Sequence, residues 1–178
     1  MTAAAAFHRP IRVDALPPNG LTQTIEANPA ERAALAALNG LPAIASLTAT
    51  LTVRRRGRDG AQVTGEVHAA ITQVCGVTLE PFPATVDELI DLSFAPLEEA
   101  RPKRRDSEPA EEAVELGGED PPDPIVDGRI DLGAVAAEFF ALGLDPYPRK
   151  PGVAFAAPAP PDGKESPFAA LAKLKKKR

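Results

Sequence analysis

Three side chains of the kind that carry nucleophilic or acid–base chemistry are present: the single cysteine, Cys75, and the two histidines, His8 and His68. Cys75 ends an apolar run and has no base at a recognisable spacing, which predicts a small buried side chain rather than a nucleophile. His68 falls on the polar face of a predicted strand and His8 lies near the N-terminus, so we expect surface histidines. The chain contains no phosphate-binding glycine loop, no His-Glu-x-x-His and no Gly-x-Ser-x-Gly. These features predict a protein that is not an enzyme and has no catalytic, cofactor or metal site.

Three carboxylates support one alternative, an enzymatic function. Asp123, Asp127 and Asp131 recur every four residues, and carboxylates that hold a metal ion are common in hydrolases and nucleases. Pro124 and Gly128 oppose a helix across this segment, and Asp131 precedes an apolar helical stripe, as an N-cap does. A small metal-dependent hydrolase or nuclease therefore stays as the alternative function.

Basic residues gather in two runs that suit contacts with phosphate, since each neutralised phosphate releases counterions. A charged β-turn and a solubilising tail would explain the same runs equally well. The candidate contacts with RNA or a protein partner are Arg54, Arg55, Arg56, Arg58, Arg149, Lys150, Lys173, Lys175, Lys176, Lys177 and Arg178.

The net charge of −5 is distributed unevenly along the chain. Residues 1–60 carry seven basic and four acidic groups, residues 61–148 carry five and 19, and residues 149–178 carry eight and two. An acidic body repels phosphate within a Debye length of about 8 Å. A basic protein contacting residues 106–131 is therefore at least as good a partner as RNA.

The composition, with 178 residues, 44% apolar side chains, 20 Pro, seven Phe and no Trp, indicates one globular domain with a modest core. A single cysteine excludes an intramolecular disulfide, and no apolar run approaches the roughly 18 residues of a membrane span. We expect a cytoplasmic protein with a flexible N-terminus (1–9), one domain (10–150) and a Pro/Ala-rich linker with a basic tail (151–178). Within the domain, residues 100–122 are expected to form a mobile acidic loop.

Local signals place the elements of the first half. Residues 10–16 and 21–25 predict an edge hairpin or a bent strand. A helix is predicted between Asn28 and Asn39, because an Asn N-cap, a Pro and a Glu open it and Asn-Gly closes it; its apolar stripe is Ala34, Leu35 and Leu38. Two runs of alternating apolar and polar residues, one on each side of Gly57-Arg-Asp-Gly60, predict a long β-hairpin within residues 44–74.

The second half completes an α+β fold. Residues 86–94 predict a third antiparallel strand, with a short helix over residues 87–92 as the alternative, and residues 125–130 predict a short strand or turn. A helix follows Asp131, with the stripe Leu132, Val135, Ala136, Phe139 and Leu142, and ends near Asp145. The predicted architecture is an antiparallel sheet, with a barrel-like form as one option, packed by two main helices.

Several stretches together resemble the YceD family of large ribosomal RNA subunit accumulation proteins, in its proteobacterial form. They are Cys75-Gly-Val-Thr-Leu-Glu-Pro-Phe82, an acidic loop, Asp123-Pro-Ile-Val-Asp-Gly-Arg-Ile-Asp-Leu-Gly133, Ala141-Leu-Gly-Leu-Asp-Pro-Tyr-Pro-Arg-Lys-Pro151 and Pro167-Phe-Ala-Ala-Leu-Ala-Lys-Leu174.

The resemblance implies a bacterial, non-enzymatic factor in ribosome biogenesis that binds ribosomal RNA or a large-subunit ribosomal protein, with no membrane and no small-molecule substrate. Many family members carry Cys-x-x-Cys at the hairpin end. Thr78 occupies the second position here, and one thiolate without histidine neighbours makes a poor zinc site.

Overall fold

The computed structural model describes residues 7–57, 59–97 and 121–155 of the chain. Most of the predicted acidic loop at 100–122, and all of the basic tail after residue 155, lie outside the described residues. The predictions made for those segments therefore stay predictions.

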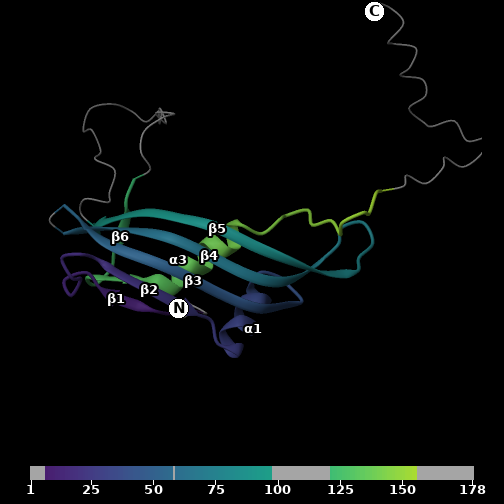
Figure 1. Cartoon of the computed structure of the whole chain (residues 1–178), viewed down its shortest axis with the longest axis horizontal. Coiled ribbons are helices and arrows are strands. Elements are labelled where there is room, and N and C mark those ends of the chain that lie inside the picture. Colours follow the sequence, from purple (N-terminus) through teal and green to yellow (C-terminus); the bar gives the residue numbers. More distant parts are fainter. Residues whose placement is uncertain (1–6, 58, 98–120, 156–178) are drawn as a thin grey trace, which may run out of the picture.

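Five strands form the main sheet, in the spatial order β2 (Leu21–Glu26), β3 (Ala43–Arg56), β4 (Gly60–Val74), β5 (Pro81–Pro96) and β6 (Asp123–Ile125) (Figure 1). Neighbouring strands are antiparallel from β2 to β5, whereas β6 runs parallel to β5. Within the described residues β2 and β6 lie at the two edges and do not pair with each other. The sheet is therefore open, and the barrel-like option is not realised as a closed barrel.

A second, two-stranded sheet joins β1 (Pro10–Arg12) to β7 (Arg129–Asp131), with Ile11 opposite Ile130. The described helices are α1 (Pro29–Leu38) and α3 (Leu132–Leu142). Two helices beside a largely antiparallel sheet make the fold broadly α+β, as predicted. Neither of these helices has the length and apolar character needed to cross a bilayer.

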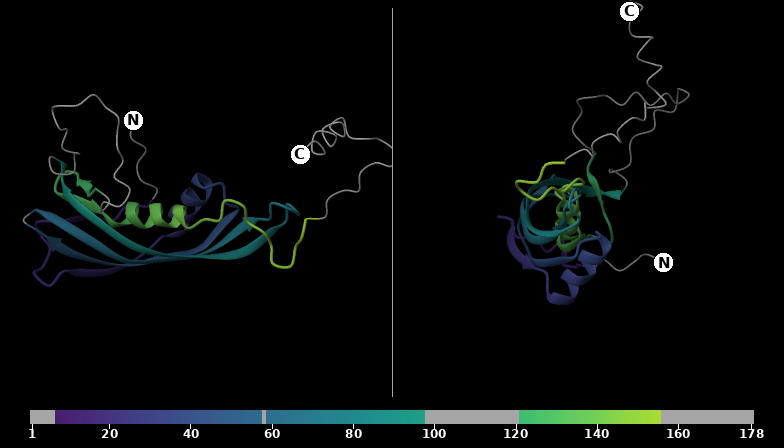
Figure 2. Two further views of the ribbon diagram at one scale, coloured as in Figure 1. Left: turned by 90° about the horizontal axis from the view of Figure 1, so that it is seen from above. Right: turned by 90° about the vertical axis from the view of Figure 1, so that its right-hand side faces the viewer.

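The main sheet curls around α3, as the end-on view in Figure 2 shows. Alternate side chains of β3, β4 and β5 are buried on the concave face and form one core with Phe140 of α3: Leu47, Leu51, Val53, Val63, Val67, Val86, Ile90 and Phe94. At Gly65, in the middle of β4, a Cβ atom would lie 2.1 Å from the Thr50 carbonyl oxygen. Glycine at this position lets the two long strands approach closely where the sheet bends.

The strand predictions are confirmed where pairing is local. The long hairpin is β3 and β4, joined by a tight turn. β5 confirms the third strand, and the alternative helix over residues 87–92 is wrong, because these residues pair with β4 as part of one continuous antiparallel ladder. The edge-hairpin option for residues 10–25 is also wrong: β1 pairs with β7, and β2 pairs with β3. The partner of β1 lies too far along the chain for a local pattern to reveal it.

Capping residues predicted both ends of α1. The Asn28 side chain accepts the backbone N–H of Glu31, and the Glu31 carboxylate accepts the N–H of Asn28 in return. The buried face, however, consists of Leu35 and Ala36, while Leu38 is 76% exposed. The predicted stripe is therefore wrong in part, because only Leu35 and Ala36, in the second half of α1, are buried.

In α3 the buried face is Leu132, Val135, Ala136 and Phe140 rather than the predicted stripe. Phe139 is half-buried against this core, and Leu142 is 71% exposed. The first two turns confirm the prediction, whereas the last turn extends past the edge of the buried core. Asp131 caps the helix as expected, accepting the N–H groups of Gly133 and Ala134.

Residues 7–9, predicted as part of a flexible N-terminus, lie between α1 and α3. Phe7 is fully buried, and the Arg9 guanidinium lies 4.7 Å from its ring centre. Arg9 also donates two hydrogen bonds to the Glu31 carboxylate, at 2.7 and 3.0 Å, which hold the pKa of Glu31 below its ordinary value. The carbonyl of Arg9 accepts the N–H of Leu132 at 3.0 Å. Packing thus starts before the expected boundary at residue 10.

Candidate functional site

The predicted basic run at the β3–β4 turn divides into residues with different surroundings. Arg55 donates to the backbone carbonyls of Asp14 at 2.8 Å and Leu16 at 3.1 Å, so it fastens the tip of β3 to the loop after β1. Arg56 donates to the Ser93 hydroxyl on β5. The Arg54 side chain is exposed, and its guanidinium makes no hydrogen bond or ion pair to another described residue. Arg54 is thus the described member of this run best placed to meet a partner, and Arg58 lies outside the described residues.

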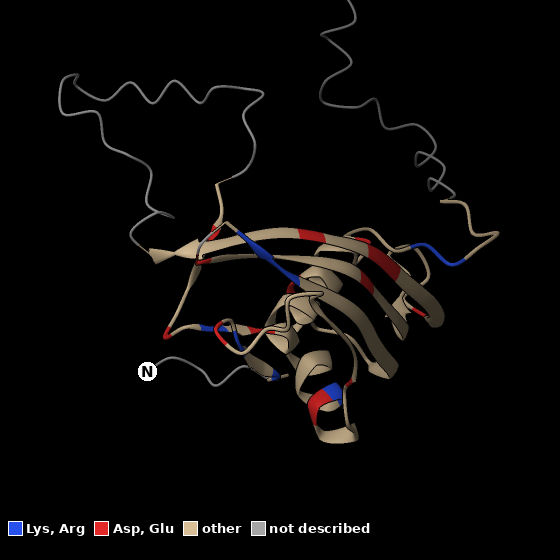
Figure 3. Cartoon of the chain, turned by 60° about the vertical axis from the view of Figure 1, so that its left-hand side comes forward, with Lys and Arg blue, Asp and Glu red and all other residues tan. Residues whose placement is uncertain are grey.

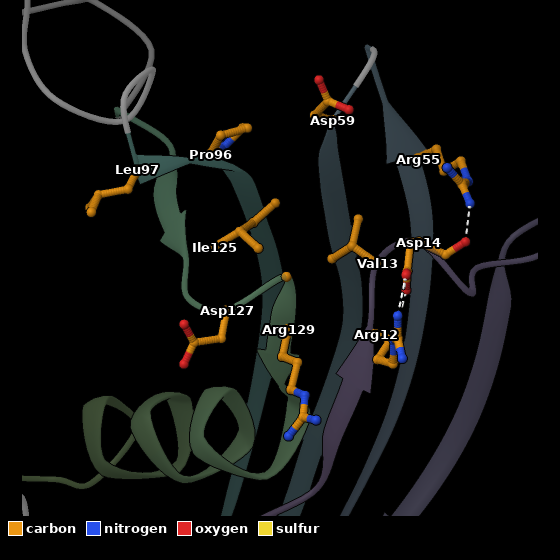
Figure 4. Close-up of a pocket in the computed structure, with 11 residues that line it drawn as sticks. Arg12, Val13, Asp14, Arg55, Asp59, Pro96, Leu97, Ile125, Asp127 and Arg129 are labelled. Carbon is orange, nitrogen blue, oxygen red and sulfur yellow. Dashed lines mark hydrogen bonds and ion pairs between the residues drawn. The ribbon is translucent and has the colours of Figure 1, made fainter.

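A pocket of about 590 Å³ opens beside this turn, between the ends of β3 and β5 and the loop before β7 (Figure 4). Its charged lining consists of three arginines and three aspartates: Arg12, Arg55, Arg129, Asp14, Asp59 and Asp127. Val13, Pro96, Leu97 and Ile125 supply apolar walls. Arg12 and Arg129 were not predicted as site residues, because each is an isolated cation in the sequence and only the β1–β7 pairing brings them together.

The charges of this pocket are largely balanced. Arg12 pairs with Asp14, and the same hydrogen bond raises the pKa of Arg12 and lowers that of Asp14. Arg55 is engaged by the backbone carbonyls already described. The Arg129 side chain is exposed, and its guanidinium has no hydrogen bond or ion pair to another described residue. The pocket can hold a polar group that accepts from Arg129, but it lacks the excess of positive charge that a polyanion would require.

The three spaced aspartates do not form a metal centre. Asp131 is the N-cap of α3 and also accepts the backbone N–H of Arg9 at 2.6 Å. Asp127 lies in the turn before β7 with a positive φ of 51°, and Asp123 begins β6. Within residues 7–57, 59–97 and 121–155, no group of three or more His, Cys, Asp or Glu side chains is placed to hold a metal ion. The carboxylate-based hydrolase or nuclease gains no support from this geometry.

Both histidines form pairs with carboxylates at the surface. His8 contacts Asp131 beside the start of α3, and His68 contacts Asp87 across β4 and β5. The side chains of His8 and His68 are 63% and 54% exposed. The expectation of surface histidines is confirmed for both.

The other end of the sheet brings two distant segments together around Cys75. The carbonyl of Pro148 accepts the N–H of Gly76 at 2.8 Å, and the N–H of Lys150 points at the Cys75 sulfur at 3.4 Å. The Lys150 ammonium also lies 3.1 Å from the Glu80 carboxylate. Arg149 is exposed beside them.

Cys75 is fully buried, as predicted. Hydrogen bonds from the Lys150 backbone and then from the side chain and backbone of Thr78 lower the pKa of its thiol to about 6. Thr78, three residues after Cys75, therefore serves as a hydrogen-bond partner of the sulfur. Burial keeps this thiol away from large reagents.

The candidate contact residues that the structure describes do not form one patch. Arg54, Arg55 and Arg56 lie at the β3–β4 turn, while Arg149 and Lys150 lie beside the β4–β5 turn, at the opposite end of the same hairpin. Figure 3 shows the charges of the described chain, with acidic residues along β4 and β5. Lys173, Lys175, Lys176, Lys177 and Arg178 lie outside the described residues.

Comparison with known proteins gives one clear result. The family model of the large ribosomal RNA subunit accumulation protein YceD matches residues 63–175. The chain belongs to the YceD family. The matched range includes most of β4, all of β5 and α3, and both segments that meet at Cys75. No curated protein and no solved structure shows significant similarity to the chain.

Proposed function

We propose that this protein is a non-enzymatic factor that supports the accumulation of large-subunit ribosomal RNA in the bacterial cytoplasm. The observation that carries the proposal is the YceD family match over residues 63–175. The proposed mode of action is binding, either to ribosomal RNA or to a large-subunit ribosomal protein. The separated basic ends and the acidic middle of the sequence favour a contact made at several points of an assembling particle.

The test is a pull-down of the full-length protein from cell extract at low salt, with and without ribonuclease. Large-subunit ribosomal RNA or proteins should be enriched over small-subunit components. A partner that persists after ribonuclease treatment is a protein, and one that is lost is bound through RNA. Equal recovery of both subunits, or of neither, would remove the proposal.

Two arginine variants separate binding from folding in this experiment. Arg54→Glu changes an exposed side chain, so it should weaken recovery of large-subunit components and leave the melting temperature unchanged. Arg55→Gln removes the bonds to the carbonyls of Asp14 and Leu16, so it should lower stability by about 1–3 kcal/mol. If Arg54→Glu leaves recovery intact, the β3–β4 turn is not a contact region.

A further inference from the structure

β5 has one long edge that no strand covers. It pairs with β4 from Pro81 to Phe94, but its other side pairs only with the short β6, at residues 94–96 (Figure 1). Within the described residues, no backbone hydrogen bond joins residues 82–91 to any segment other than β4. Alternate N–H and C=O groups along this edge are therefore available to another strand.

The usable part of this edge is residues 85–91, which we call the free β5 edge. Pro81 and Pro83 cannot donate a backbone hydrogen bond, so they limit strand pairing at the beginning of β5. The remaining stretch is as long as a typical strand.

The outer side chains of the free β5 edge are acidic and apolar in alternation. Asp87, Leu89 and Asp91 face outward, and Leu89 is 79% exposed. A hollow of about 290 Å³ lies beside them and includes Glu66 and His68 of β4 in its lining. Figure 3 shows acidic residues on β4 and β5 in this region. A lysine or arginine on an added strand would lie directly beside these carboxylates.

The charges determine which occupant fits. Two copies of this chain pairing through the same edge would bring Asp87 and Asp91 against each other, and like charges on paired strands are destabilising. RNA would bring phosphates against the same carboxylates. A basic extended polypeptide satisfies both the open backbone groups and the acidic side chains.

The opposite edge of the sheet, formed by β2, does not combine a long open backbone edge with acidic outer side chains. β2 has six residues, and its outward Thr22 and Thr24 hydroxyls bond to Thr52 and Thr50 of β3 at 2.9 and 3.1 Å. The carbonyl of Glu26, at the end of β2, already accepts the Arg9 guanidinium. β2 therefore offers a shorter edge with a largely neutral outer face.

We propose that the free β5 edge binds an extended, lysine- or arginine-rich segment of another protein by β-strand addition, with basic side chains beside Asp87 and Asp91. This inference deepens the proposed function and rests on it for one point, that the segment belongs to a ribosomal protein. The backbone edge and its charges are independent of that point.

The first experiment uses hydrogen exchange of the full-length protein alone and with a short synthetic peptide of alternating lysine and valine. The β5 amides that point away from β4 should exchange fast in the free protein and become protected when the peptide binds. Protection of these amides in the free protein would show that another part of the chain covers the edge, and it would overturn the proposal. Absence of protection with saturating peptide would also overturn it.

The second experiment separates strand addition from charge attraction. The same peptide N-methylated at alternate residues keeps its charge but loses its donors, so it should bind at least about tenfold more weakly by fluorescence anisotropy, a change of ~1.4 kcal/mol. Equal binding of both peptides would mean that only charge is recognised. A single-stranded RNA oligonucleotide that protects the same amides would likewise reject a polypeptide partner.

Charge reversal provides the matched pair of variants. Asp87→Lys with Asp91→Lys should weaken peptide binding about tenfold, since two favourable cross-strand pairs become repulsive. Glu26→Lys makes the same kind of change at the β2 edge and should bind the peptide normally. If the natural protein binds the peptide, but cells lacking the protein have unchanged ribosomal RNA, the proposed function alone is refuted. If the natural protein does not bind the peptide, but cells lacking the protein have reduced large-subunit RNA, this inference alone is refuted.

Discussion

The backbone N–H of Lys150 lies 3.4 Å from the sulfur of Cys75, across a separation of 75 residues. A second bond, from the N–H of Gly76 to the carbonyl of Pro148 at 2.8 Å, fixes the same contact. The segment that follows α3 is thus fastened to the β4–β5 turn. Both segments belong to the region that matches the YceD family.

The lowered pKa of Cys75 predicts a pH-dependent contribution to stability. The thiol has a pKa of about 6 in the folded protein, against an ordinary value of 9.0. Between these values the unfolded chain binds more protons, so the contribution rises with pH, is complete above about pH 9 and is lost as the pH falls through about 6. Urea unfolding from pH 5 to 9 should show this rise in the natural protein and not in Cys75→Ala.

Thr78→Val tests the cause of that pKa. The variant removes one hydrogen bond to the sulfur and keeps the shape of the side chain, so the thiol pKa should rise. Because the chain has a single cysteine, ultraviolet absorbance of the thiolate reports this site alone. An unchanged titration in Thr78→Val would show that Thr78 does not stabilise the thiolate.

The buried face of α3 predicts different costs for two neighbouring side chains. Phe140 is fully buried in the core, so Phe140→Ala should lower the free energy of unfolding by about 3–5 kcal/mol. Leu142 is 71% exposed, so Leu142→Ala should change it by less than about 0.5 kcal/mol. Thermal and urea unfolding measure both, and equal costs would contradict the assigned face.

Gly65 should tolerate no side chain. Its Cβ would lie 2.1 Å from the Thr50 carbonyl oxygen, so Gly65→Ala should cost about 3 kcal/mol or more through displaced backbone. Gly128 provides the control, because it has a positive φ of 67° but no atom within 4 Å of the added Cβ. Gly128→Ala should cost about 1–2 kcal/mol from backbone strain alone. A smaller loss at Gly65 than at Gly128 would mean that the two strands are not held closely there.

Sequence patterns were sufficient for features set by neighbouring residues. The capping box at Asn28 and Glu31, the N-cap at Asp131 and the alternation of the β3–β4 hairpin all follow from contacts within a few residues. The resemblance to the YceD family also rested on short runs and is confirmed.

Features set by long-range packing could not be predicted in the same way. The pairing of β1 with β7 and the Arg9–Glu31 contact join distant segments, and no local pattern specifies either. The hydrogen bond from Arg55 on β3 to the Asp14 carbonyl, in the loop after β1, was not predicted for the same reason. A basic run identifies charge, but only the fold shows which of its members already have partners.

The most direct test of the proposed function is the ratio of large- to small-subunit ribosomal RNA in cells of the source organism that lack this protein. The ratio should fall, and expression of the full-length chain should restore it. An unchanged ratio in the absence of the protein would contradict the proposal.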